Sequence, residues 1–130
     1  MVPVTRARGL LLVVRMASLL VMVVQVFAQA EPTMATYYAN KYAGKPTASG
    51  QPYDPYALTA AHPSLPFGTE LSVSYGGKNV VVTVNDRIPV ESASDLDLSW
   101  AAAQALGLTE VGTATVDAAV VEDQPVVSST

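Results

Sequence analysis

Alternation of apolar and polar residues at every second position constrains the fold of this chain more than any other feature. It is clearest in residues 70–75 and 78–84, two runs that a Gly-Gly pair separates. Period two is the pattern of a β-strand, and two glycines supply the positive φ angles of a tight hairpin turn. The second run holds three valines in succession, at 80–82, which predicts a strand buried on both faces.

One segment beyond residue 30 has the pattern of a helix. Residues 100–106 are rich in alanine and leucine, Ser99 can cap their start, and Gly107 can end them. Many short strands with one short helix predict a compact all-β barrel, whose closure leaves no exposed sheet edge. Besides the hairpin, strands are expected at residues 34–39, 57–61 and 113–121.

The N-terminal thirty residues have the pattern of a cleavable signal peptide. Arginines at 6, 8 and 15 precede an uncharged apolar run, 16–28, and then Ala28-Gln29-Ala30. The alternative is a membrane anchor, but a helix of that run rises only about 20 Å against a hydrocarbon core of roughly 30 Å. We therefore expect cleavage after Ala30 or Ala28, no stable membrane anchor, and a periplasmic or secreted protein.

The remaining chain divides into one domain, residues 31–122, and a flexible tail, 123–130. It holds four basic residues against all eleven acidic ones, a formal charge of −7, so a nucleic-acid partner is not expected. The sequence has no cysteine, which removes disulfides, a thiol nucleophile and a cysteine-linked lipid anchor. With one histidine and no cysteine, a metal site is not expected either, nor is a cofactor.

Three blocks of the sequence resemble the RlpA-like lytic transglycosylases. They are residues 45–69, with the motifs Ala-Leu-Thr-Ala-Ala-His and Leu-Pro-Phe-Gly-Thr, residues 80–89, with Val-Asn-Asp-Arg, and residues 95–107. The resemblance implies a six-stranded double-psi β-barrel with one short helix, more distantly similar to expansin and barwin-like domains. It also implies that the protein cleaves peptidoglycan glycan strands to 1,6-anhydro-muramyl products. We expect the protein to be a monomer.

The resemblance assigns the catalytic positions to Asp86, as the main acid/base, and His62, as its orienting partner. At position 51 the resemblance implies a catalytic glutamate, but this chain has Gln51, which can bind a sugar but cannot transfer a proton. We expect Gln51, His62 and Asp86 to face one groove. The alternative function is a non-catalytic, expansin-like module that binds glycan or loosens the wall.

Each of these side chains also has a structural interpretation. Asp86 could cap a loop or pair with the neighbouring arginine, and a lone histidine is often a satisfied structural residue. Asp97 precedes the predicted helix, where a negative charge is favourable, but it also matches an aspartate that borders the expansin groove. Most of the tyrosines are expected to pack, with Tyr38 and Tyr53 the better candidates for binding substrate.

Overall fold

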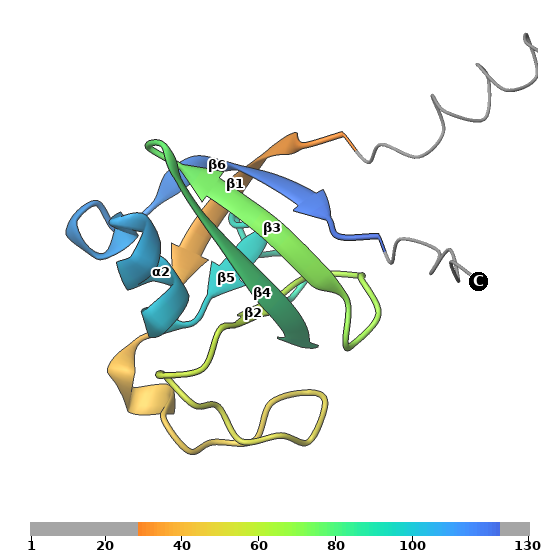
Figure 1. Ribbon diagram of the computed structural model, residues 1–130. Coiled ribbons are helices and arrows are strands. Elements are labelled where there is room, and N and C mark those ends of the chain that lie inside the picture. Colours follow the sequence, from red (N-terminus) through yellow and green to blue (C-terminus); the bar gives the residue numbers. More distant parts are fainter. Residues whose placement is uncertain (1–28, 123–130) are drawn as a thin grey trace, which may run out of the picture.

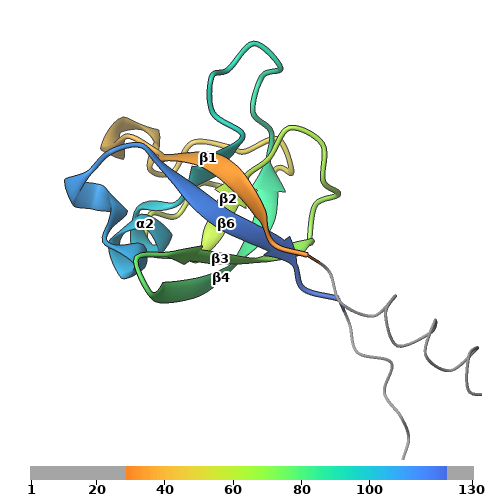
Figure 2. The same cartoon turned by 90° about the horizontal axis from the view of Figure 1, so that it is seen from above.

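The computed structural model describes residues 29–122, which form a closed six-stranded barrel with one helix. Around the barrel the strands follow the order β1-β5-β2-β4-β3-β6, shown in Figures 1 and 2. The predicted signal peptide, except for its last two residues, and the predicted tail lie outside the described residues. The elements are β1 (Glu31–Tyr37), η1 (Asn40–Tyr42), β2 (Thr59–Ala61), β3 (Glu70–Tyr75), β4 (Lys78–Asp86), β5 (Leu96–Leu98), α2 (Trp100–Leu106), η2 (Leu108–Glu110) and β6 (Ala114–Val120).

The all-β prediction and the predicted hairpin are confirmed. β3 and β4 pair antiparallel across a turn in which Gly76 and Gly77 have φ of 57° and 78°. The expectation that β4 is buried on both faces is wrong, because Val81 is 41 % exposed while its neighbours Val80 and Val82 are buried. A barrel wall this small has its core on one side only, so the usual alternation of strand residues holds even in a run of valines.

Two parallel pairings tie distant segments together. β1 pairs parallel with β5, and β2 pairs parallel with β4, while the remaining pairs are antiparallel. Parallel neighbours bring the C-terminal ends of their strands to the same edge of the sheet. As a result Tyr37, at the end of β1, pairs with Leu98 at the end of β5, and Ala61, at the end of β2, pairs with Asp86 at the end of β4.

The helix α2 covers one end of the barrel. Ser99 caps it by accepting a hydrogen bond from the N–H of Ala102 (3.2 Å), and Gly107 ends it in the left-handed conformation, as predicted. The helix buries Ala102, Ala103 and Leu106 against the core. Within residues 29–122 no helix is long and apolar enough to span a membrane.

Candidate functional site

A β-bulge at the end of β4 sets the direction of Asp86. Ala60 of β2 pairs with Val84, but the next residue, Ala61, pairs with Asp86, so Asn85 is the extra residue. Without the shift Asp86 would follow Val82 and Val84 toward the core. With the shift it shares the side of Ala61, so the carboxylate leaves the hydrophobic interior.

Asp86 and Asp97 therefore lie in one row across neighbouring strands. Ala61 pairs with Asp86 on one side and with Asp97 of β5 on the other, and Asp97 pairs in turn with Thr36 of β1. Two strand spacings separate the Cα atoms of the aspartates, roughly 10 Å. Two acidic groups that are 11 positions apart in the sequence thus face the same region.

The Asp86 carboxylate is surrounded by donors. Its Oδ1 accepts the backbone N–H groups of Ala48 and Arg87, each at 2.8 Å, and its Oδ2 accepts the hydroxyl of Tyr38. One donor comes from a loop, one from the following residue and one from the end of β1. This set holds the carboxylate in a fixed position on the side of the barrel wall that faces away from the core.

Tyr38 is itself held by aromatic contacts. Its ring stacks on that of Tyr53 (centroids 4.3 Å apart, 14° between planes) and meets Tyr42 edge to face. Burial, followed by the hydrogen bond and the negative charge of Asp86, raises the pKa of Tyr38, so its hydroxyl keeps its proton as a donor. Tyr53 is only 4 % exposed, and its hydroxyl accepts the N–H of Trp100 (3.0 Å), so Tyr53 acts by holding Tyr38 and the start of α2.

Asp97 has a different environment from Asp86. Burial raises its pKa to about 6, the hydrogen bond from Thr36 Oγ1 (3.2 Å) opposes that rise, and the charge of Asp86 adds to it. Two carboxyl groups near each other with unequal surroundings can divide the roles of proton donor and acceptor. With this pKa, Asp97 holds a proton at mildly acidic pH.

This shift predicts how stability changes with pH. The pKa of Asp97 is higher in the folded protein than its ordinary value of 3.8, so between pH 3.8 and about 6 the native state binds more protons than the unfolded state. Stability of the wild type must therefore fall, relative to Asp97→Asn, as pH rises through this window. Urea denaturation of both proteins at pH 4, 5, 6 and 7 measures the difference. Asp117→Asn, on the exposed side of β6, is the matched control, and a difference for Asp97→Asn that is flat with pH would contradict the assignment.

Gln51 lies next to Asn85, the bulge residue. Its Oε1 accepts the Asn85 side-chain amide (3.4 Å), and its backbone carbonyl accepts both the N–H (2.8 Å) and the hydroxyl (2.6 Å) of Thr47. The N–H of Ser49 also bonds the Asn85 carbonyl (3.2 Å). These contacts fasten the loop that carries both Gln51 and the Ala48 donor to the end of β4.

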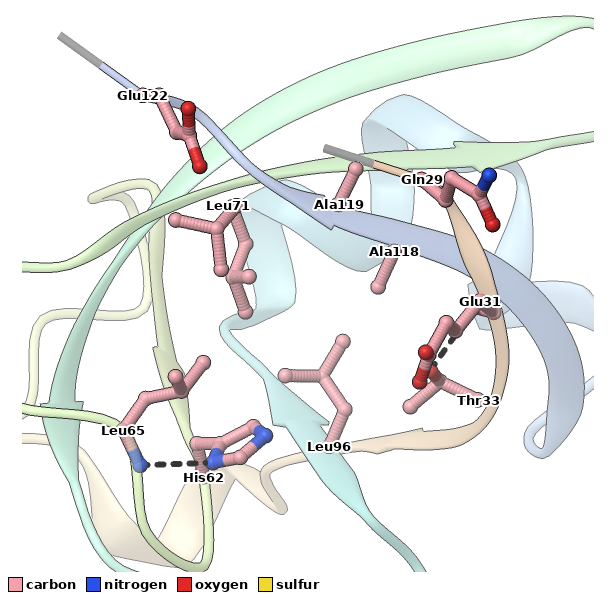
Figure 3. A pocket seen from close by; sticks show the side chains of 11 residues that line it. Gln29, Glu31, Thr33, His62, Leu65, Leu71, Leu96, Ala118, Ala119 and Glu122 are labelled. Atoms are coloured by element: carbon pink, nitrogen blue, oxygen red, sulfur yellow. Dashed lines mark hydrogen bonds between the residues drawn. The ribbon is translucent and has the colours of Figure 1, made fainter. Parts of the chain in front are cut away.

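His62 contacts Asp86 through its backbone only. Its N–H donates to the Asp86 carbonyl (3.2 Å), while its imidazole turns into a cavity of about 390 Å³, lined by Leu65, Leu96 and Glu31 among others (Figure 3). Nδ1 accepts the N–H groups of Ser64 (3.1 Å) and Leu65 (3.0 Å). Burial and then the charge of Arg87 lower the pKa of His62, with Asp95 acting in the opposite direction.

The side chains predicted to share one groove are thus brought together in part. Asp86, Asp97, Tyr38 and the Gln51 loop meet at the ends of β1, β5 and β4, whereas the His62 imidazole lines a separate cavity that does not include Asp86. A catalytic role for His62 stays a prediction. The sequence analysis missed the backbone donors on Asp86 and the bulge at Asn85, because neither a main-chain N–H nor a register shift has a residue signature.

Fold and site together define a small double-psi β-barrel with two neighbouring carboxyl groups on the outer side of its wall. The profile of the family described as lytic transglycolase matches residues 31–118, and the chain belongs to this family. The chain is 44 % identical over 110 residues to the Treponema pallidum (strain Nichols) protein named "Probable endolytic peptidoglycan transglycosylase RlpA". The match covers 80 % of this chain and 35 % of that protein. It is 48 % identical over 84 residues to "Endolytic peptidoglycan transglycosylase RlpA" of Pseudomonas aeruginosa (strain UCBPP-PA14), covering 63 % of this chain and 25 % of that protein. The chain thus spans about a third or less of these relatives' length.

Solved structures share the barrel. The Streptomyces papain inhibitor superposes with a TM-score of 0.60 at 27 % identity, covering 72 % of this chain and 96 % of that one. A Clavibacter michiganensis expansin, solved in complex with cellohexaose, superposes with a TM-score of 0.59 at 22 % identity, covering 76 % of this chain and 52 % of that one. At this identity the expansin likeness concerns the fold alone, which agrees with the distant similarity predicted from the sequence.

Proposed function

We propose that this protein is a lytic transglycosylase that cleaves the glycan strands of peptidoglycan and leaves 1,6-anhydro-muramyl ends. The observation that carries the proposal is the pair of neighbouring carboxyl groups with unequal surroundings, Asp86 and Asp97, in a barrel of this family. The names of the relatives support the same reaction. Because peptidoglycan lies outside the cytoplasm, the proposal agrees with the predicted signal peptide and a periplasmic or secreted protein.

The reaction needs one proton donor and one proton acceptor, and no water. A proton passes to the glycosidic oxygen as the bond from C1 of the muramyl residue to that oxygen breaks. The 6-hydroxyl oxygen of the same residue bonds to C1, and its proton passes to a base. The positive charge that develops at C1 is stabilised by a neighbouring carboxylate.

The surroundings of the two aspartates suggest which of them donates the proton and which accepts it. Asp97, whose pKa is raised to about 6, serves as the proton donor. The Asp86 carboxylate accepts hydrogen bonds from Ala48, Arg87 and Tyr38. It stabilises the positive charge at C1 and accepts the proton of the 6-hydroxyl. Tyr38, fixed on Tyr53, aims its hydroxyl at the reacting region. The Gln51 amide is left to bind a sugar hydroxyl.

A second candidate function has one observation in its favour. Gln51 is an amide at the position where the resemblance implies a glutamate, and its Oε1 accepts the Asn85 amide, so the position supplies no carboxylate. A non-catalytic module that binds or loosens glycan, in the manner predicted from the expansin likeness, needs the groove without that group. The two functions differ in whether 1,6-anhydro-muramyl products are released, which can be measured directly.

The deciding experiment is product analysis of peptidoglycan incubated with the purified protein. We expect slow release of 1,6-anhydro-muramyl fragments, detected by mass spectrometry, and faster release at pH 5 than at pH 8, because Asp97 loses its proton as pH rises through about 6. Peptidoglycan without protein at each pH is the control. Binding with no anhydro product at either pH would favour the non-catalytic module, and products that retain a reducing end would show hydrolysis instead.

A further inference from the structure

An exposed aromatic corner lies beside the start of α2. Tyr56 is 80 % exposed, and its ring meets that of Trp100 nearly at a right angle (81°, centroids 6.3 Å apart). The two rings border a cavity of about 340 Å³ whose other lining residues are Asn40, Ala43 and Pro55. Apolar rings beside a side-chain amide form a surface with both stacking and hydrogen-bonding groups, as small-molecule sites have.

The backbone holds this corner in place. The N–H of Tyr56 donates to Asp54 Oδ1 (2.9 Å), and the N–H of Ala57 donates to the Asp54 carbonyl (3.2 Å), which together close a tight turn. The Pro55 carbonyl accepts the N–H of Ala101 (2.9 Å), which joins this turn to the first turn of α2. These hydrogen bonds fix the turn that carries Tyr56, so the exposed position of its side chain is set by ordered backbone.

The corner is linked to the carboxylate site by a chain of contacts. The N–H of Trp100 donates to the Tyr53 hydroxyl (3.0 Å), the Tyr53 ring stacks on Tyr38, and the Tyr38 hydroxyl donates to Asp86. The contacts from Asp86 to Tyr56 thus run through four aromatic residues, Tyr38, Tyr53, Trp100 and Tyr56, and one link is the backbone N–H of Trp100. Only Tyr38 and Tyr53 stand between Asp86 and Trp100 in this chain of contacts, so the corner lies a few residues' width from Asp86.

We propose that Tyr56 and Trp100 form a second saccharide subsite, which binds an N-acetylhexosamine unit of the same glycan strand at a distance from the bond that is cut. The proposal rests on the proposed function, since it takes the strand over Asp86 as its starting point. In β-1,4-linked hexosamines the ring substituents are equatorial, so both faces of each ring present C–H groups that pack on aromatic rings. The acetamido and hydroxyl groups at the ring edge match the amide of Asn40.

The sole tryptophan of the chain makes the subsite directly observable. The purified protein is titrated with the β-1,4-linked hexamer of N-acetylglucosamine while the fluorescence of Trp100 is followed. We expect a saturable change in emission, and a Kd that Tyr56→Ala raises roughly three- to tenfold, the effect of losing one aromatic contact. Tyr56 is exposed, so its removal leaves the fold intact. Val81→Ala, at a 41 % exposed position on β4, is the control and keeps the wild-type Kd.

The outcomes separate this subsite from the proposed reaction. No saturable change in Trp100 emission, or the same Kd for Tyr56→Ala and the wild type, overturns the subsite, even where peptidoglycan is cleaved. A saturable change that Tyr56→Ala weakens, with no anhydro product from peptidoglycan, supports the subsite and overturns the proposed cleavage. Equal weakening by Val81→Ala and Tyr56→Ala overturns the subsite as well, because the effect would then be general.

Discussion

Asp86→Asn is expected to reduce the release of anhydro products by about 10²–10⁴-fold, the usual cost of losing a positioned acid or base. Asparagine has the shape of aspartate, and its oxygen can still accept the N–H groups of Ala48 and Arg87. Its amide can face the hydroxyl of Tyr38, which accepts as well as donates. The variant therefore removes the charge and the proton acceptor while leaving the loop contacts in place.

The measurement is the rate of anhydro-muramyl release from peptidoglycan, followed by mass spectrometry beside the wild type. Asp117→Asn, which makes the same chemical change at an exposed position on β6, is expected to keep the wild-type rate. Circular dichroism of each protein checks that the barrel is intact. Release by Asp86→Asn at the wild-type rate would overturn the mechanism, because it would show that Asp86 neither accepts the proton of the 6-hydroxyl nor stabilises the charge at C1.

Much of the fold could be predicted because its elements have strong local signatures. The β3–β4 hairpin follows from period-two alternation around a Gly-Gly pair, and α2 follows from its Ser99 cap and Gly107 stop. The strand β5 was missed, since its three residues, Leu96–Leu98, are too few to show a period. Its pairing with β1 and β2 depends on distant parts of the chain and has no local pattern.

The site was predictable to a lesser degree. The family likeness selected Asp86, Gln51 and Asp97, and the stacking of aromatic rings on sugars selected Tyr38. The structure places Asp86, Tyr38 and Asp97 close together, with the loop that carries Gln51 beside them. The family likeness could not indicate that the His62 imidazole turns away, because the direction of that ring follows from two backbone N–H groups in the turn after it. The shifted register at Asn85, on which the direction of Asp86 depends, is likewise a three-dimensional property.

Gln51→Glu is expected to raise the rate of anhydro release, by roughly ten- to a hundredfold if the added carboxylate takes part in the reaction. A carboxylate here would stand where the resemblance implies the family's glutamate, and would help to stabilise the positive charge at C1. The replacement preserves the local structure, because glutamate has the shape of glutamine and its oxygen can still accept the Asn85 amide. The backbone bonds from Gln51 to Thr47 do not involve the side chain.

Gln104→Glu is the matched control, since it makes the same change at an exposed position on α2, and it is expected to leave the rate unchanged. The double variant Gln51→Glu with Asp86→Asn tests whether the gain depends on Asp86, and we expect it to be as slow as Asp86→Asn alone. An unchanged or lower rate for Gln51→Glu would contradict this prediction, because a carboxylate at position 51 would then add nothing to the reaction. In that case the pair of Asp86 and Asp97 already supplies every carboxyl group that the reaction uses, and Gln51 serves to bind the sugar.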